Sequence, residues 1–190
     1  MRLADLVATG ASGEAQEALL RGLLDEYAET LAPHVRKLLA DFRCVDVARK
    51  VVGVGSVGTR AWIMLLKGRD ERDPLELQAK EAQGSVLEAH LGPAPHDHRG
   101  RRVVEGGRFM QAASDPLLGW ERATGIDGVV RDFYVRPLWD GKWSAAIDTL
   151  PPQRMAVYAE LCGWALARAH GRSGDRVAIA AYLGSGPSLR

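Results

Sequence analysis

The stretch Lys50-Val-Val-Gly-Val-Gly-Ser-Val-Gly-Thr-Arg60 decides how the rest of the chain is interpreted. Its three glycines, Gly53, Gly55 and Gly58, form the pattern G-x-G-x-x-G. Glycine permits positive φ angles and lets a ligand approach the main chain closely. Free N–H groups in such a loop can hold phosphates. The pattern therefore indicates either a phosphate-binding loop or a glycine-rich hairpin that binds no ligand.

The residues after Gly58 distinguish two phosphate-binding folds. A dinucleotide-binding fold has a helix after the glycines and an acidic residue about 20 positions later. A kinase-like fold has the glycines at a hairpin and a lysine on the third strand. Residues 59–66 form a short apolar run, residues 68–74 a charged turn, and residues 75–80 alternate with a period of two. This order favours the kinase-like fold with Lys80 on the third strand, while the dinucleotide alternative needs a helix from Thr59.

Length and composition bound the class of protein. The 190 residues suffice for one domain or one and a half, and 46% hydrophobic residues provide a sizeable core. A net charge of +1 gives no global field that would attract nucleic acid or an acidic membrane surface. The two cysteines, Cys44 and Cys162, match no metal-ligand spacing and fit a reducing compartment. Without a signal peptide or a long apolar run, we expect a cytoplasmic protein with no nucleic-acid or membrane partner.

The remaining pattern predicts an α+β fold. We expect helices at residues 14–31, 34–42, 101–113, 153–170 and 175–183, and strands at residues 116–122 and 131–139. Residues 44–48 are interpreted as a connector. The result is a kinase-like N-lobe at residues 49–142, with a five-stranded antiparallel sheet and one αC-like helix. An N-terminal helical segment, residues 1–48, and a linker with a long C-terminal helix and the start of a second lobe, residues 143–190, flank it.

A kinase-like lobe needs a carboxylate to hold its lysine in place for the phosphates. Glu105, on the helix predicted after the third strand, is the first candidate, and Glu88 is the second. The alternative for Glu105 is a surface ion pair with a neighbouring arginine such as Arg101, worth well under about 1 kcal/mol. Both interpretations remain open from the residues alone.

Three further groups resemble catalytic motifs, and we expect each to be structural. The pair His96 and His98 can ligate a metal, but no third ligand has a readable spacing, so a solvated loop is expected. Asp175 follows a His-Gly pair, yet a catalytic loop needs an asparagine about five residues later, and the chain contains no asparagine. Asp132 precedes Phe133 in the manner of a metal-binding motif but lies within a strand pattern.

Four stretches of the sequence resemble one uncharacterised bacterial family, domain of unknown function twenty-two fifty-two. They are residues 51–60, 78–82, 102–115 and 162–175, and the resemblance extends from about residue 41 to residue 184. The family is grouped with protein-kinase-like and aminoglycoside-phosphotransferase-like proteins. The resemblance therefore implies phosphoryl transfer from ATP with Mg²⁺ to an unknown small-molecule acceptor.

The resemblance also implies roles for individual residues. Phosphates would be held by Gly53, Gly55, Ser56 and Gly58 and paired with Lys80, whose partner would be Glu105. In the family, a Gly-Asp-x-His catalytic loop and a metal-binding aspartate precede the glycine-rich stretch, and this chain begins after them. We therefore expect the second part of a longer protein: a nucleotide-binding lobe that lacks its catalytic loop and is inactive alone.

Two other hypotheses stay open beside the kinase-like one. The chain could be a non-catalytic scaffold or interaction module in which the glycine-rich turn binds nothing. It could also be a dinucleotide-binding oxidoreductase, if a helix follows Gly58. A missing second lobe implies exposed apolar surface on the helix at residues 153–170, and hence possible self-association.

Overall fold

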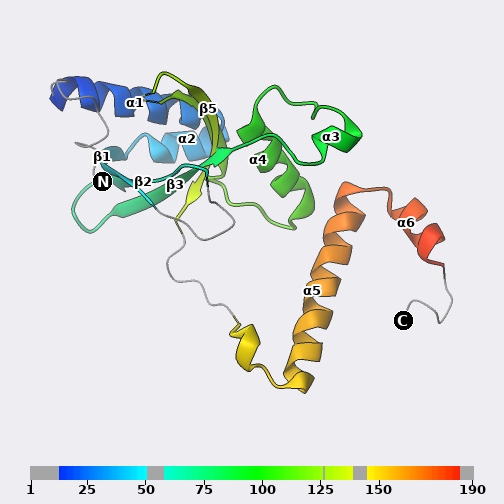
Figure 1. Ribbon diagram of the computed structural model, residues 1–190. Helices are drawn as coiled ribbons and strands as arrows, with labels where there is room; N and C mark the ends of the chain where they lie inside the picture. The colour runs from blue at the N-terminus through cyan, green and yellow to red at the C-terminus, as the bar shows by residue number, and fades with distance from the viewer. Residues whose placement is uncertain (1–12, 51–57, 126, 139–144, 185–190) are drawn as a thin grey trace. The chain divides into compact units, whose positions relative to one another are not determined.

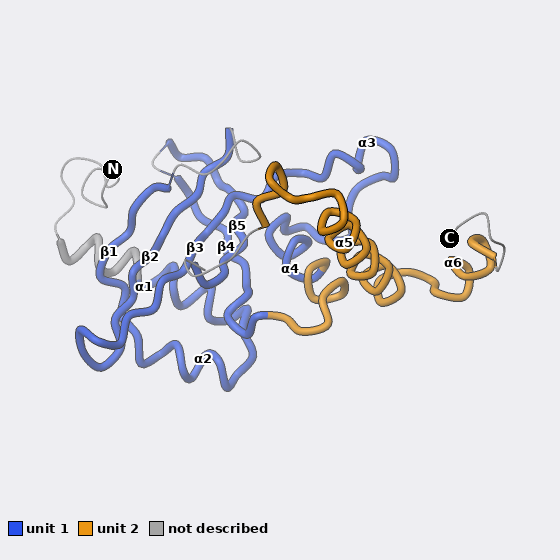
Figure 2. Tube along the Cα trace, turned by 90° about the horizontal axis from the view of Figure 1, so that it is seen from below, with its two compact units in different colours: residues 1–105, 115–138 blue, residues 106–114, 139–190 orange. Residues whose placement is uncertain are grey.

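The computed structural model describes residues 13–50, 58–125, 127–138 and 145–184, with the side chains of the first helix described from residue 21 onward (Figure 1). The chain forms two compact units, shown in blue and orange in Figure 2. One unit comprises residues 1–105 and 115–138, and the other comprises residues 106–114 and 139–190. Each unit is described by itself below.

The first unit is built on a five-stranded antiparallel sheet. Its strands are β1 (Arg43–Arg49), β2 (Ala61–Lys67), β3 (Pro74–Ala82), β4 (Gly119–Thr124) and β5 (Val130–Pro137). Their order in the sheet is β1-β2-β3-β5-β4. The first three strands follow one another as a meander, and the β4–β5 hairpin adds to the free side of β3. The predicted α+β fold with a five-stranded antiparallel sheet is confirmed.

Two N-terminal helices, α1 (Gly13–Glu29) and α2 (Pro33–Leu39), cover one face of this sheet (Figure 1). The strand register brings the alternate apolar residues of neighbouring strands to that face, as in the pairs Val47–Met64 and Met64–Leu77. Helix and strand side chains share one core: Tyr27, Leu31, Val35, Leu39, Val47, Met64, Leu66, Leu77, Ala79, Phe133 and Val135. Burying each large apolar side chain contributes roughly 1.5–3 kcal/mol, so the helices are part of the same folding unit as the sheet.

Helix α4 (Arg99–Met110) begins on the opposite face of the sheet, after the short helix α3 (Glu88–Leu91). The amide of Arg99 donates to the carboxylate of Asp132 on β5, at 2.8 Å. Gly100 lies directly on β5, because a Cβ atom added there would come within 2.1 Å of the carbonyl oxygen of Phe133. The first turn of α4 is therefore held on the sheet by the hydrogen bond to Asp132, and Gly100 permits the close approach because it has no side chain.

The second unit contains a short 3₁₀ turn (Ile147–Thr149), α5 (Pro152–Ser173) and α6 (Arg176–Leu183). Proline at the start of α5 suits a helix N-terminus, where its missing N–H costs nothing. Asp175 caps α6, since its carboxylate accepts from the amides of Val177 and Ala178. Asp175 therefore has a structural role as a helix cap, as predicted from the sequence.

The structure corrects two expectations about the strands. Residues 44–48 are not a connector but part of β1, which starts the sheet; the alternation of Val45 and Val47 with polar residues was the signal. Residues 61–67 form strand β2 in an antiparallel sheet, whereas a dinucleotide-binding fold requires a helix there. The helix after Gly58 on which the oxidoreductase alternative depends is therefore not formed at residues 61–67.

Candidate functional site

Lys80 lies on β3 next to the end of the glycine-rich stretch. In the β2–β3 ladder it is opposite Ala61, three residues after Gly58, and in the β3–β5 ladder it is opposite Tyr134. The residue is partly buried. Asp132 lies two residues before Tyr134 on β5 and receives the amide of Arg99, so Lys80 and the start of α4 belong to the same face of the sheet.

Gly58 has the backbone conformation that makes glycine useful in a turn. Its φ angle is +83°, and a Cβ atom added there would meet no atom within 4 Å. The main chain at Gly58 is therefore accessible, and its conformation disfavours any residue with a side chain. The other three residues predicted to hold phosphates, Gly53, Gly55 and Ser56, lie outside the described residues.

We expect Gly58→Ala to lower the free energy of unfolding by about 1–2 kcal/mol, through backbone strain alone. Gly128 in the β4–β5 turn is a matched control, because its φ is +71° and a Cβ atom there also meets nothing within 4 Å. Urea unfolding of both alanine variants measures the effect. A much larger loss at Gly58 than at Gly128 would contradict the view that only backbone conformation constrains this position.

Glu105, the predicted partner of Lys80, lies on α4 and contacts two other side chains. Its carboxylate accepts from Arg101 Nε at 2.6 Å and lies 3.1 Å from His96 Nε2. The second candidate, Glu88, accepts the amide of Ser85 through its carboxylate and thereby closes the turn that begins α3. The role of Glu105 toward Lys80 stays a prediction.

The loop with His96 and His98 was expected to be solvated, but the structure shows that one of its histidines is largely buried. The side chain of His98 is only 12% exposed, and its Nδ1 accepts from the amide of Arg101 at 3.2 Å. Its Nε2 lies 3.7 Å from the Asp132 carboxylate, which also accepts from Arg122 Nε at 2.6 Å. Burial lowers the pKa of His98, although Asp132 opposes this shift. These contacts attach the loop before α4 to the sheet. The prediction of a solvated loop was wrong because the contacts join segments that are distant in the sequence.

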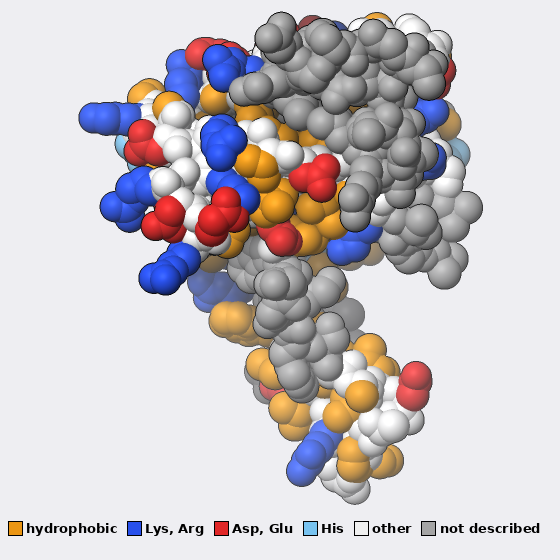
Figure 3. Space-filling model, turned by 90° about the vertical axis from the view of Figure 1, so that its left-hand side faces the viewer, with side chains coloured by type: hydrophobic (Ala, Val, Ile, Leu, Met, Phe, Trp, Pro, Cys, Tyr) orange, Lys and Arg blue, Asp and Glu red, His pale blue; other side chains and the backbone are white. Residues whose placement is uncertain are grey.

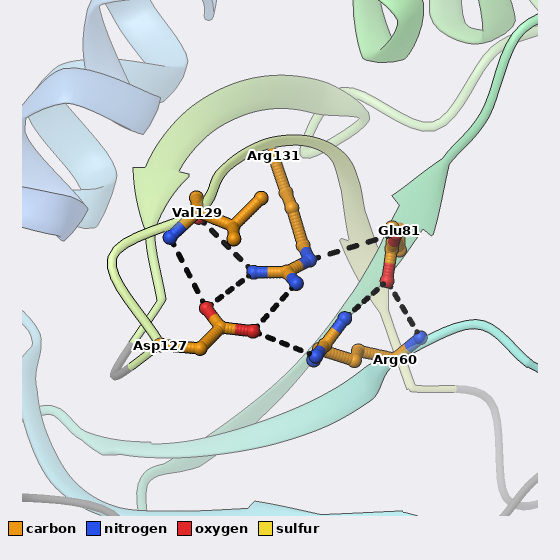
Figure 4. A network of polar contacts seen from close by, with 5 residues as sticks. All are labelled: Arg60, Glu81, Asp127, Val129 and Arg131. Atoms are coloured by element: carbon orange, nitrogen blue, oxygen red, sulfur yellow. Dashed lines mark hydrogen bonds and ion pairs between the residues drawn. The ribbon is translucent and has the colours of Figure 1, made fainter.

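A second polar cluster, not anticipated from the sequence, surrounds the start of β2 (Figure 4). Arg60, two residues after Gly58, donates its amide to Glu81 and its guanidinium to Asp127. Arg131 donates to both carboxylate oxygens of Asp127. The cluster therefore joins the end of the glycine-rich stretch, the residue after Lys80 and the β4–β5 hairpin. These residues come together through the register of β2, β3 and β5, which could not be predicted from the sequence.

The comparison with protein families identifies one relationship. A family model described as an uncharacterized protein conserved in bacteria, DUF2252, matches residues 3–190. The chain belongs to this family. No curated protein and no solved structure matches the chain. The resemblance proposed from four stretches is thus confirmed for the bacterial family, which itself has no stated activity.

The described residues of this DUF2252 member bring a positive-φ glycine and a lysine together at one end of the sheet. Gly58 supplies an open main chain in the turn before β2, and Lys80 supplies a cation on β3. Among the residues described, no group of three His, Cys, Asp or Glu side chains is arranged to hold a metal ion. Asp132 and Asp175, which resemble metal-binding and catalytic aspartates in sequence, are occupied by Arg122 and by the α6 amides.

A cavity of about 290 Å³ lies at the same end of the sheet. Its charged lining balances three carboxylates against three guanidinium groups: Glu81, Asp97, Arg99, Arg122, Arg131 and Asp132. The face seen in Figure 3 likewise carries Lys and Arg side chains interspersed with Asp and Glu. Among the helices in the described part of the chain, none has the length and low polarity needed to cross a bilayer.

Proposed function

We propose that this chain is the nucleotide-binding lobe of a kinase-like phosphotransferase and that it binds ATP. One observation carries the proposal: the antiparallel β2–β3 register sets Lys80 opposite Ala61, three residues after the open, positive-φ glycine Gly58. A cation on the third strand beside a glycine-rich turn is the arrangement that kinase-like folds use for ATP phosphates.

The topology around Lys80 supports the same proposal. A helix, α4, connects β3 to the β4–β5 hairpin and starts on the face to which Lys80 belongs. That helix carries Glu105, which a kinase-like lobe would use to orient the lysine. Arg101 and His96 also contact the carboxylate of Glu105.

The chemistry assigned to the chain is binding rather than turnover. The ammonium group of Lys80 would neutralise phosphate charge, and main-chain amides near Gly58 would donate hydrogen bonds to phosphate oxygens. In phosphoryl transfer, Mg²⁺ supplies the remaining charge neutralisation.

Thermal unfolding with and without Mg-ATP tests the proposal. A ligand that binds only the folded state, at 100 times its Kd, stabilises by about 2.7 kcal/mol. For a chain of this size, that stabilisation raises Tm by roughly 5–10 °C. We expect Lys80→Ala to remove the rise and Lys67→Ala, at the opposite end of β2, to retain it. A folded wild-type chain with no rise at millimolar ATP would refute nucleotide binding.

A second candidate function, an interaction module without a ligand, is favoured by the apolar surface of the second unit. Large apolar side chains on α5 and α6 are exposed: Val157, Leu161, Trp164, Leu166, Val177, Tyr182 and Leu183. Val157, Leu161 and Trp164 recur at four- and three-residue spacing and so share one side of α5. Exposed apolar groups of this kind mark contact surfaces. Concentration-dependent self-association without any response to ATP would favour this function over nucleotide binding.

A further inference from the structure

We infer that the four-residue cluster of Arg60, Glu81, Asp127 and Arg131 is a positioning device for the nucleotide site. It holds residues 58–60, the approach to β2, against the end of β3 that carries Lys80. The inference rests on the proposed function, because it concerns how the main chain near Gly58 and Lys80 is held in the geometry that binds nucleotide. It adds residues that the glycine pattern and the lysine do not include.

The first connection joins Arg60 to Glu81 twice through the main chain. The amide of Arg60 donates to Glu81 Oε2 at 3.0 Å, and the amide of Glu81 donates to the carbonyl oxygen of Arg60 at 2.8 Å. The Arg60 guanidinium also lies 3.5 Å from Glu81 Oε2. The carboxylate of Glu81 thus extends the β2–β3 pairing by one residue beyond Ala61, toward Gly58.

The second connection brings in the β4–β5 hairpin. Asp127 accepts from Arg60 Nη2 at 3.1 Å, and from Arg131 Nη1 and Nη2 at 2.8 and 2.7 Å. The amide of Val129 donates to the same carboxylate at 3.2 Å. Arg131 returns to Glu81, with Nε 3.8 Å from Oε1, which closes the ring of four charges (Figure 4).

The four charges of the cluster balance, and half of the cluster is buried. Two guanidinium groups face two carboxylates; the side chains of Glu81 and Arg131 are 12% and 13% exposed, and those of Arg60 and Asp127 are 34% and 44% exposed. The hydrogen bonds from Arg131 hold the pKa of Asp127 well below its usual range, so this carboxylate stays charged at neutral pH. Ion pairs that are shielded from solvent and form a network hold their geometry better than isolated surface pairs.

Glu81 links the cluster to the proposed nucleotide site, because it is the next residue after Lys80 on β3. Successive strand residues point to opposite faces of a sheet, so the cluster grips β2 and β3 from one face while Lys80 stands on the other. The cluster therefore fixes the distance between Gly58 and Lys80 without occupying the face on which a nucleotide would lie. A site held in its binding geometry before the ligand arrives binds more tightly than one that must first be ordered.

The test is a double-mutant cycle with Arg60→Gln and Asp127→Asn in the full chain, with two measurements on each variant. Hydrogen exchange of the amides at residues 59–61 reports how firmly the start of β2 is held. Titration with a fluorescent ATP analogue and Mg²⁺ reports affinity. We expect exchange at these amides to rise about five- to tenfold and Kd to weaken by a similar factor. The double variant should resemble each single variant, because either change opens the ring.

The control removes an isolated, more exposed ion pair at the other end of β2, through Lys67→Gln and Glu71→Gln. It should leave exchange at residues 59–61 and Kd unchanged. Unchanged exchange in the Arg60 and Asp127 variants would overturn the inference, whether or not nucleotide binds. Faster exchange with unchanged Kd would also overturn it. Faster exchange in a chain whose wild type binds no nucleotide would refute the proposed function, and with it the assigned purpose of the cluster.

Discussion

Glu121→Gln is expected to stabilise the protein strongly at pH 9 and to change its stability little at pH 4.5. Glu121 lies on β4, is 8% exposed, and its Oε1 has no hydrogen-bond partner among the described residues. Burial, with a smaller contribution from Glu26 on α1, raises the pKa of its carboxyl group from 4.5 to about 8. A carboxyl group with a raised folded-state pKa favours folding only while it is protonated.

The pH window follows from these two values. The stabilising effect of the neutral carboxyl is complete below about pH 4.5 and is lost as the pH rises to about 8. A shift of this size corresponds to roughly 3–5 kcal/mol at pH 9. Glutamine keeps the shape and stays neutral, so the variant should lack that loss. Urea unfolding at pH 4.5, 7 and 9 measures it.

Glu76→Gln is the control for Glu121→Gln, because Glu76 is an exposed glutamate on β3 of the same sheet. Its substitution should leave the pH profile of unfolding as in the wild type. If the wild type and Glu121→Gln lose stability in parallel between pH 4.5 and 9, the carboxyl of Glu121 is not buried in its neutral form.

Gly100→Ala is expected to be the most damaging single-methyl change in the first unit. The added Cβ atom would come within 2.1 Å of the carbonyl oxygen and 2.7 Å of the carbonyl carbon of Phe133. Both atoms belong to the backbone of β5, so no side chain can rotate away to make room. Relief requires α4 to move off the sheet, which strains the bond from the Arg99 amide to Asp132. We expect a loss of about 3 kcal/mol or more.

Gly106→Ala in the same helix provides a control with the opposite sign. A Cβ atom at Gly106 meets nothing within 4 Å, and alanine in a helix is favoured over glycine by about 1 kcal/mol. Thermal unfolding of both variants should therefore show a lower Tm for Gly100→Ala and a higher Tm for Gly106→Ala. A mild effect at Gly100 would mean that α4 does not rest on β5.

Local patterns explain what could be predicted from the sequence. The period-two alternation at residues 75–80 identified β3, and the long apolar stripe after residue 153 identified α5. Tyr27 and Leu31 recur at helical spacing, and both lie in the core. Each of these signals lies within one element and needs no knowledge of the neighbouring strand.

Contacts between distant segments could not be predicted in the same way. Arg60 meets Asp127 only because β2, β3 and β5 adopt one register, and His98 is covered only because α4 begins against Asp132. Glu121 alternates with Trp120 on an ordinary-looking strand, and nothing local reveals that its side faces α1. Burial and pairing of charged groups are properties of the assembled sheet, so the sequence pointed to Lys80 but not to the charged groups near it.

The two edge strands of the described sheet have a further consequence for how molecules of this protein behave toward one another. β1 is an edge strand with a register shift between Cys44 and Asp46, and there the Asp46 carboxylate accepts the amide of Val47 at 2.8 Å. On the other edge, β4, Thr30 Oγ1 accepts the amide of Trp120 at 3.2 Å. An edge whose amides are satisfied internally, or whose line is broken by a bulge, is a poor template for a strand from another chain. These two contacts and the register shift therefore make the edges of the described sheet poorer templates for a strand from a second molecule.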